Sequence, residues 1–265
     1  MKLATLKKIL TAGLLGAAFV TVTAHAADLL DEVKQRGTLR IGLEGTFPPF
    51  NSKNASGELV GFDVDIAKAV AAKLGVKPEF TTTEWSGIIA GLQAGKFDVI
   101  VNQVGATDAR KQVLDFSPAY TYSGPQLIER KDDPREFKSL DDLKGKKLGL
   151  GLGTNYEQMA KAVPGIDVKT YPGAPEYLRD LAAGRLDAAL NDKLMVAYLL
   201  KGSQLPLRAG AQLNSDTPSA IPFRKGNPKF AKAIDDAMTQ LEADGTFKKI
   251  SEKWFGIDVT KPKGK

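Results

Sequence analysis

The chain has 265 residues, of which 43% are hydrophobic and 26% are charged. This is the composition of a globular protein, and the length is sufficient for two domains. There is no cysteine and only one histidine, which excludes a disulfide framework, a thiolate nucleophile, an iron–sulfur site and cysteine-ligated zinc.

The first 26 residues have the pattern of a secretory signal peptide. Three lysines give a basic start, residues 9–20 are apolar but too short to span a bilayer, and residues 24–26 form an A-x-A cleavage site. The alternative is an N-terminal anchor helix, although no longer apolar stretch follows. A lipid anchor would require a cysteine at the new N-terminus. We therefore expect a soluble, exported and non-lipidated mature chain that begins at Ala27.

Removal of this segment takes away three of the 37 basic residues, none of the 31 acidic residues and the single histidine, His25. The net charge of +6 falls by half, and so small an excess does not predict a nucleic-acid partner. Without histidine or cysteine, the mature chain has no serine–histidine triad and no HExxH zinc site. An enzyme would have to use carboxylates, lysine or tyrosine, which favours a binding function.

Short apolar runs alternate with helical patterns along the mature chain, which predicts βα units and an α/β fold. Glycines and capping residues mark where these elements end. In chain order we expect a strand over 38–43, a helix over 62–74 capped by Asp63, an extended segment over 79–83, a helix over 85–94, a buried strand over 98–101, an extended segment over 120–129, a short helix over 139–144, a strand over 147–150, alternating helix and strand to about 207, and two helices over 227–244 and 246–255.

The most informative feature is an internal repeat. Residues 92–103 (LQAGKFDVIVNQ) and 181–192 (LAAGRLDAALND) share one pattern at an offset of 89. A weaker echo at an offset of 108 relates Gly37, Gly45 and Thr46 to Gly145, Gly153 and Thr154. We interpret the repeat as two similar α/β lobes. Because α/β sheets bind ligands at the carboxyl ends of their strands, a cleft lined by 102–103 and 191–192 is expected.

One charged residue from each half is a candidate for ligand binding. Thr107 is predicted to cap a helix that has Arg110 in its first turn, where an arginine opposes the helix dipole unless an anion binds there. An arginine can hold a carboxylate through two parallel hydrogen bonds. Asp192, at the matching place in the other half, can hold an ammonium group. A solvated arginine and a simple N-cap aspartate are the alternatives.

Other candidates surround the expected cleft. Phe47, Phe50 and Trp85 are either cleft walls or core residues. Glu44 is an acid at the end of the first strand, and either faces the cleft or lies in a solvated turn. The turn Gly153-Thr154-Asn155-Tyr156 offers backbone N–H groups to a ligand. The preceding glycines read GxGxG rather than GxGxxG, so a dinucleotide site is not indicated, and no P-loop is present.

Several motifs together resemble the periplasmic polar-amino-acid binding proteins of ABC importers. They are GLEGTFPPF (42–50), GELVGFDVDIAKAVAAKLG (57–75), T-x-x-R followed by VLDFSPAY (113–120), DDLKGKKLGLGLGT (141–154), AAGRLDAALND (182–192) and ADGTFKKISEKWFG (243–256). The chain is most similar to the cystine-binding branch of this family in VNQV (101–104), GLGTNYEQ (151–158) and SEKWFGIDVT (251–260).

The resemblance implies the type II periplasmic binding-protein fold. One lobe would contain 27–120 and 220–265, the other 121–219, with hinges near 120–124 and 215–219. It further implies a periplasmic monomer without a cofactor, which delivers its ligand to an ABC permease in the inner membrane.

The resemblance also implies roles for the candidate residues. Arg110 would hold the α-carboxylate of the ligand, with backbone groups of Gln103, Gly105 and Asn155, and Asp192 would hold the α-ammonium. The side-chain slot would be walled by Phe47, Phe50 and Trp85, with Glu44 at its far end. Position 105 is usually Ser or Thr in the family, so Gly105 lacks a hydroxyl contact to the carboxylate.

The function expected is capture of L-cystine or cysteine by hinge closure. Cystine carries two amino-acid heads and needs a second polar pole, for which the candidates are Glu44, Asn102, Tyr122, Thr154 and Tyr156. The alternatives are a binding protein for another polar or cationic amino acid, an exported dehydratase that uses a pocket acid such as Glu44, and a sensor domain that reports on an amino acid without transport.

Overall fold

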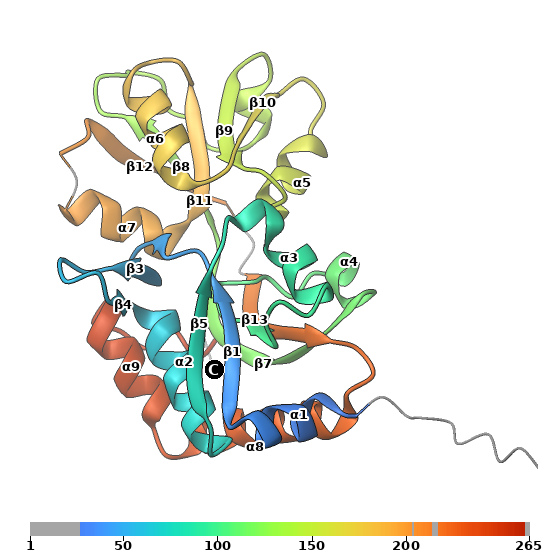
Figure 1. The fold of residues 1–265 in the computed structure, drawn as a ribbon. Helices are drawn as coiled ribbons and strands as arrows, with labels where there is room; N and C mark the ends of the chain where they lie inside the picture. Colours follow the sequence, from blue (N-terminus) through green and yellow to red (C-terminus); the bar gives the residue numbers. More distant parts are fainter. Residues whose placement is uncertain (1–26, 203, 214–216, 263–265) are drawn as a thin grey trace, which may run out of the picture.

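The computed structural model describes residues 27–202, 204–213 and 217–262, so the expected signal peptide over 1–26 lies outside the described residues. Two five-stranded sheets with helices on their faces form two lobes, one above the other in Figure 1. The two-lobe α/β architecture expected from the repeat is confirmed.

The first lobe is built on a sheet with the order β5-β1-β6-β13-β7. Its helix α2 is apolar on nearly every side and packs between the sheet and α9 (Figure 1), which places the main core of this lobe there. The elements of this lobe are α1 (Leu29–Arg36), β1 (Thr38–Leu43), α2 (Phe62–Lys73), β5 (Lys77–Thr82), α3 (Trp85–Gln93), β6 (Val99–Ile100), α4 (Asp108–Lys111), β7 (Leu114–Ser123), β13 (Thr217–Arg224), α8 (Pro228–Ala243) and α9 (Thr246–Phe255).

The second lobe repeats this arrangement with the order β10-β9-β11-β8-β12. In both sheets the first three strands are parallel and the fourth is antiparallel to the third. The elements are β8 (Pro125–Arg130), the 3₁₀ helix η1 (Asp141–Leu143), β9 (Lys147–Gly151), α5 (Asn155–Lys161), β10 (Asp167–Tyr171), α6 (Ala174–Ala182), β11 (Ala188–Asp192), α7 (Lys193–Gly202) and β12 (Leu207–Gln212).

The repeated sequence has the same local structure in both lobes. α3 and α6 each end before a glycine in the left-handed region, Gly95 and Gly184, both with φ of 73°. The aspartates that follow, Asp98 and Asp187, each accept a hydrogen bond of 2.8 Å from a backbone N–H of the neighbouring parallel strand, β1 or β9. The next residues form β6 and β11. The repeat therefore specifies one helix–turn–strand unit used twice.

The chain passes between the sheets twice. β7 leads into β8 through the single residue Gly124, and β12 leads back to β13 through a segment that includes residues 214–216, which lie outside the described part of the chain. β7 and β13 pair antiparallel along most of their length. The two crossings therefore lie side by side, while the exact lobe limits and hinge positions stay a prediction.

Local contacts correct several expectations. Asp63 does not cap α2: Gly61 is the N-cap residue, with φ of 142°, and a Cβ there would lie 2.1 Å from the carbonyl oxygen of Phe50. The Asp63 side chain is buried instead. The strand expected over 98–101 is limited to β6, and the short helix over 139–144 is the single turn η1. A small sheet of β2 (Thr46–Phe47), β3 (Asn51–Lys53) and β4 (Leu59–Val60) was not expected.

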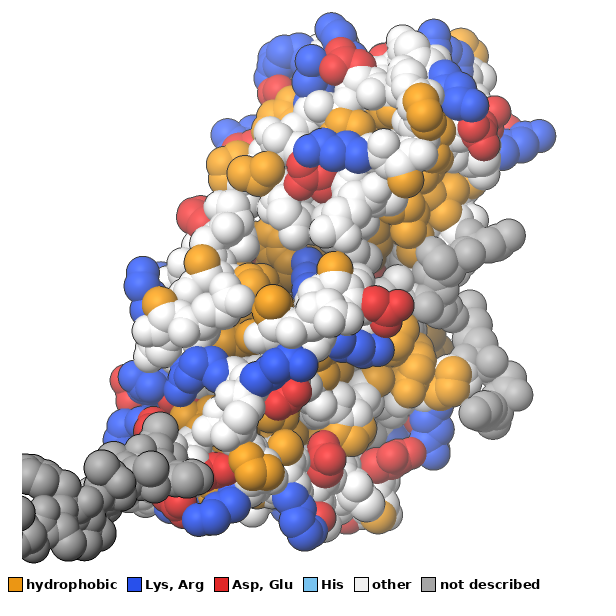
Figure 2. Space-filling model, turned by 90° about the vertical axis from the view of Figure 1, so that its right-hand side faces the viewer, with side chains coloured by type: hydrophobic (Ala, Val, Ile, Leu, Met, Phe, Trp, Pro, Cys, Tyr) orange, Lys and Arg blue, Asp and Glu red, His pale blue; other side chains and the backbone are white. Residues whose placement is uncertain are grey.

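The described surface is mixed in charge. On the face shown in Figure 2, basic and acidic side chains alternate over both lobes, and the basic ones do not form a single patch. Among the helices of the described ranges, none has the length and apolar character needed to cross a membrane.

Candidate ligand-binding site

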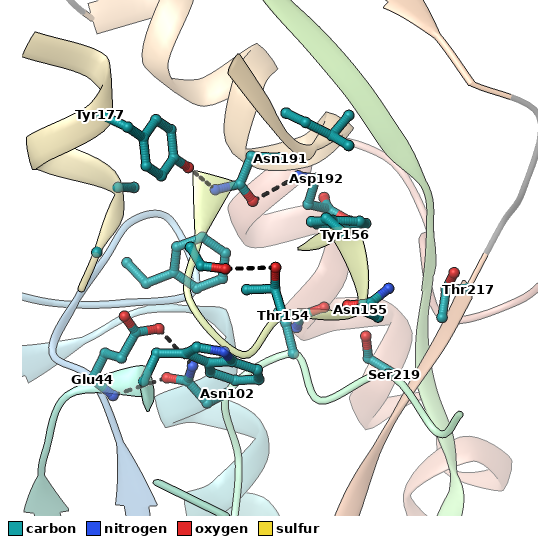
Figure 3. A pocket seen from close by; sticks show the side chains of 18 of the residues that line it. Glu44, Asn102, Thr154, Asn155, Tyr156, Tyr177, Asn191, Asp192, Thr217 and Ser219 are labelled. Atoms are coloured by element: carbon teal, nitrogen blue, oxygen red, sulfur yellow. Dashed lines mark hydrogen bonds between the residues drawn. The ribbon is translucent and has the colours of Figure 1, made fainter. Parts of the chain in front are cut away.

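A cavity lies between the lobes at the carboxyl ends of strands from both sheets (Figure 3). About 690 Å³ of this space, part of it open to solvent, is not filled by protein atoms. Of the residues proposed from sequence, those that line the cavity are Glu44, Phe47, Trp85, Asn102, Gln103, Gly105, Thr154, Asn155, Tyr156 and Asp192.

Glu44 and Asn102 form the first-lobe side of the cavity. They follow the adjacent strands β1 and β6, and they are joined by two hydrogen bonds (Figure 3): Glu44 N donates to Asn102 Oδ1 at 2.9 Å, and Asn102 Nδ2 donates to Glu44 Oε2 at 2.8 Å. Burial raises the pKa of Glu44 to about 7, because a carboxylate loses hydration there and Glu84 and Asp63 add negative charge nearby. The pair gives this end of the cavity an acidic, hydrogen-bonding surface.

Arg110 is not among the residues that line the cavity, but it lies against two of them, Trp85 and Gly105. Thr107 caps α4 as predicted, with its side chain accepting from Arg110 N at 3.3 Å. The guanidinium lies over the Trp85 ring, 5.4 Å from its centroid, and donates to the carbonyl oxygens of Gly105 at 3.0 Å and Gly153 at 3.3 Å. Gly153 belongs to the other lobe, so Arg110 spans the two.

Arg110 has no carboxylate partner within ion-pair distance in the described part of the chain. Burial lowers its pKa, which shows that the guanidinium is partly desolvated in its present position. A desolvated arginine that is bonded only to carbonyl oxygens still has donors for an anion.

Asp192 lies across the cavity at the end of β11 and is buried. Its Oδ1 accepts from Leu194 N at 2.8 Å, so it does cap α7 as the simpler interpretation expected. Burial raises its pKa to about 6. The neighbouring Tyr156 hydroxyl has its pKa raised, first by burial and then by the Asp192 charge. The carboxylate therefore caps α7 at the cavity wall, and the charge of the adjacent Lys193 offsets the effect of burial on its pKa only in part.

Phe50 does not line the cavity. Its side chain has no exposed surface and packs in the core against Phe47, Phe62 and Phe255. The sequence offered both interpretations, and the placement is that of a core residue. Phe47, at 4.9 Å between ring centroids, lies between Phe50 and the cavity.

Asn191 lines the cavity, as the repeat predicted, and Tyr177 is among the lining residues that the sequence analysis did not name. Tyr177 is on α6 and is 1% exposed, and its hydroxyl accepts a hydrogen bond from Asn191 Nδ2. In Figure 3 they lie across the cavity from Glu44 and Asn102. Asn191 carries a signal in the sequence, because it occupies the repeat position that corresponds to Asn102. Tyr177 had only the pattern of a buried helix face.

The described residues contain no group of three or more aspartate, glutamate, histidine or cysteine side chains that could hold a metal. The two cavity carboxylates, Glu44 and Asp192, lie on opposite lobes. The arrangement can therefore hold a ligand with one anionic and at least one cationic group.

Residues 39–257 match the family of bacterial extracellular solute-binding proteins, family 3, and the chain belongs to this family. It is 44% identical over 266 residues to the L-cystine-binding protein TcyJ of Escherichia coli K12, which covers 98% of this chain and 100% of that protein. It is also 37% identical over 240 residues to the L-cystine-binding protein TcyA of Bacillus subtilis 168. That alignment covers 90% of this chain and 88% of TcyA.

The structure is also similar to that of an ancestral arginine-binding protein bound to arginine. The TM-score is 0.79 and the identity 43%, over 83% of this chain and 99% of that one. The predicted type II periplasmic binding-protein fold is confirmed. With relatives that are solute-binding proteins along nearly its whole length, the chain is a binding component and not an enzyme.

Proposed function

We propose that this protein captures a free amino acid in the periplasm, foremost L-cystine or cysteine, and delivers it to an ABC permease. The observation that carries the proposal is that Asp192 lines the cavity from one lobe, while Arg110 of the other lobe lies against Trp85 and Gly105 of the cavity lining and has no carboxylate partner in the described structure. An α-amino acid carries the two charges that these groups lack. The names of TcyJ and TcyA support cystine as the ligand.

In this proposal the α-carboxylate of the ligand binds Arg110 together with backbone groups of Gln103, Gly105 and Asn155. The α-ammonium binds Asp192, and Phe47 and Trp85 wall the slot for the side chain. Closure of the lobes completes the site, because no single lobe holds both charged groups. Domain closure of this kind is the general mode of periplasmic binding proteins.

The domain limits proposed are 27–120 with 220–265 for one lobe and 121–219 for the other. The hinges are near 120–124 and 215–219. Gly124 supports the first hinge, because it is the only residue between β7 and β8. The protein is proposed to act as a monomer.

Cystine has a second amino-acid head, and the far end of the cavity has polar groups for it. Glu44 offers a carboxylate to an ammonium group. Tyr177 accepts from Asn191, so its own O–H can donate to a carboxylate. Of the other candidates for this pole, Asn102, Thr154 and Tyr156 line the cavity, and Tyr122 is not among its lining residues.

A cationic amino acid is the second candidate ligand. Glu44, when ionised, favours a single positive group at the end of a side chain, and the ancestral protein that superposes on this structure is bound to arginine. Cystine and arginine differ in that only cystine adds a second negative group.

The test is calorimetric titration of the mature chain from Ala27 after unfolding, removal of carried-over ligand and refolding. L-cystine, L-cysteine under reductant, L-arginine, L-lysine and L-glutamine are titrated separately. Tight binding of cystine or cysteine supports the proposal. Tight binding of arginine or lysine alone keeps the Arg110–Asp192 site and replaces the ligand. Failure of every amino acid to bind contradicts the proposed function.

A further inference from the structure

A buried carboxylate without a basic partner lies behind the first-lobe wall of the cavity. Asp63, the second residue of α2, has no exposed surface, and no lysine or arginine in the described ranges pairs with it. Three donors converge on it instead: Gln103 Nε2 at 2.7 Å, Tyr120 O–H at 3.1 Å and Asn51 Nδ2 at 3.3 Å. Burying an ionisable group is costly, so an arrangement with three converging donors is expected to have a specific role.

Gln103 links this carboxylate to the cavity. It lines the cavity, and among the described residues it is the only non-glycine with a positive φ, at 51°. Side chains other than glycine adopt this region at a cost and need surrounding contacts to hold them there. The Gln103 backbone N–H donates to the Tyr120 hydroxyl at 3.1 Å, and that hydroxyl donates to Asp63. Both the backbone and the side chain of Gln103 are therefore held through Asp63.

The same contacts reach the strand that joins the two lobes. Tyr120 belongs to β7, which crosses to the second sheet at Gly124, and Thr121 Oγ1 lies 3.4 Å from Gln103 Nε2. Asp63 thus joins three segments: the start of α2, the cavity wall after β6 and the crossing strand β7. The side chains of Gln103 and Tyr120 belong to the same hydrogen-bond network.

We propose that Asp63 is a positioning residue for ligand binding, whose carboxylate holds the cavity-lining backbone of Gln103 in its left-handed conformation against the crossing strand β7. Asp63 does not line the cavity and does not contact the ligand. The inference rests on the proposed function, because it assumes that an amino acid occupies the cavity.

A carboxylate suits this position better than an amide or a carboxylic acid. Ionised Asp63 presents two acceptor oxygens to three donors. An asparagine presents one acceptor and brings two new donors into a site already occupied by donors. Protonation of Asp63 also adds a donor, and it leaves Gln103 free to turn its buried, unpartnered Oε1 toward the new O–H.

The charges around Asp63 set the pH at which this change occurs. Its pKa is raised to about 7, because the effect of burial outweighs the three hydrogen bonds that lower the pKa, and the charge of Asp192 across the cavity adds to the rise. Tyr120 faces it from β7 and Glu44 from the end of β1. Asp65 on the same helix turns away to Lys253 and Trp254. Below about pH 7 the positioning bonds are therefore lost by protonation.

The test compares D63N with wild type and with D65N, a matched removal of one acid from α2 that leaves the cavity wall intact. L-cystine and L-arginine are titrated from pH 5.5 to pH 8.5. We expect D63N to bind roughly tenfold more weakly than wild type near pH 8.5, and the ratio of the two dissociation constants to approach one near pH 5.5. D65N should match wild type throughout.

A double-mutant cycle separates positioning from general stability. Glycine adopts φ of 51° without strain, so in a Q103G background D63N should cost little further affinity. If D63N does not fold, Y120F carries the test, because it removes the hydroxyl that Asp63 and the Gln103 N–H share. A D63N or Y120F protein that folds and binds like wild type at pH 8.5 overturns the inference alone. A wild type that binds no amino acid overturns the proposed function and this inference with it.

Discussion

Replacing Asp192 by asparagine should weaken ligand binding and stabilise the empty protein at the same time. Burial raises the pKa of Asp192 from 3.8 to about 6, and that difference corresponds to ~3 kcal/mol of unfavourable free energy for the ionised group. A ligand ammonium next to the carboxylate recovers this free energy. D192N removes the partner of the ammonium, and breaking a buried charge pair costs about 3–5 kcal/mol. We therefore expect a loss of affinity on the order of a hundredfold or more.

The stability of the empty protein should change in the opposite direction. Because the folded-state pKa is raised, the ionised carboxylate destabilises the fold above about pH 6, and this penalty fades as the pH falls toward 4. Asparagine has no charge and can still accept from Leu194 N. At pH 8, D192N should unfold at a temperature several degrees higher than wild type without ligand.

The assay is calorimetric titration of L-cystine together with thermal melts of the ligand-free proteins. D180N is a matched control, since Asp180 is an acid of the same lobe that pairs on the surface with Arg185. It should bind as wild type does. An affinity loss of less than tenfold for D192N would refute the role of Asp192. A lower melting temperature at pH 8 would refute the electrostatic reasoning.

Three further predictions concern the same site. R110A should lose about 3–5 kcal/mol of ligand-binding free energy. R110K should be intermediate, because lysine keeps the charge but lacks the planar guanidinium that makes two parallel hydrogen bonds. A loss of affinity of less than tenfold for R110A in calorimetry would contradict the role of Arg110 in holding the ligand carboxylate. Ligand binding near pH 6 should release protons, because the ammonium group favours the ionised form of Asp192. The release is measured as a binding enthalpy that varies with the ionisation enthalpy of the buffer at pH 6 and no longer varies near pH 8. The double variant G105S/T217S should bind more tightly than G105S alone, because a Cβ at 105 would lie 3.0 Å from Thr217 Cγ2; equal dissociation constants would show that this crowding is unimportant.

The elements that the sequence predicted best have local end signals. The helix over 246–255 has the expected limits because Gly245 and Gly256 flank it, with φ of 75° and 72°. The cap of Thr107 on α4 likewise involves residues three apart. The repeat was the strongest long-range signal, because it placed Asn102 and Asn191 in equivalent positions before any contact between lobes was known.

The parts that sequence could not predict depend on contacts with distant segments. The sequence predicted Asp63 as a helix N-cap, yet Gly61 has that position and the donors of Gln103 and Tyr120 hold the Asp63 side chain inside. Phe50 and Tyr177 are both buried aromatics, but one meets other rings in the core while the other meets the cavity. Nothing within a few residues of either distinguishes them. Which of them faces a ligand is decided by the segment that packs opposite.

The three buried acids near the cavity, when ionised, destabilise the empty protein and favour the binding of a positively charged group. Burial raises the pKa of Glu44 and Asp63 to about 7 and that of Asp192 to about 6, and none of the three has an ion-pair partner in the described structure. A positive group in the cavity lowers the free energy of all three ionised forms. A protein with these carboxylates neutralised internally would be more stable when empty, but it would offer a ligand ammonium nothing to neutralise. Ligand affinity and the instability of the empty site therefore have the same physical origin.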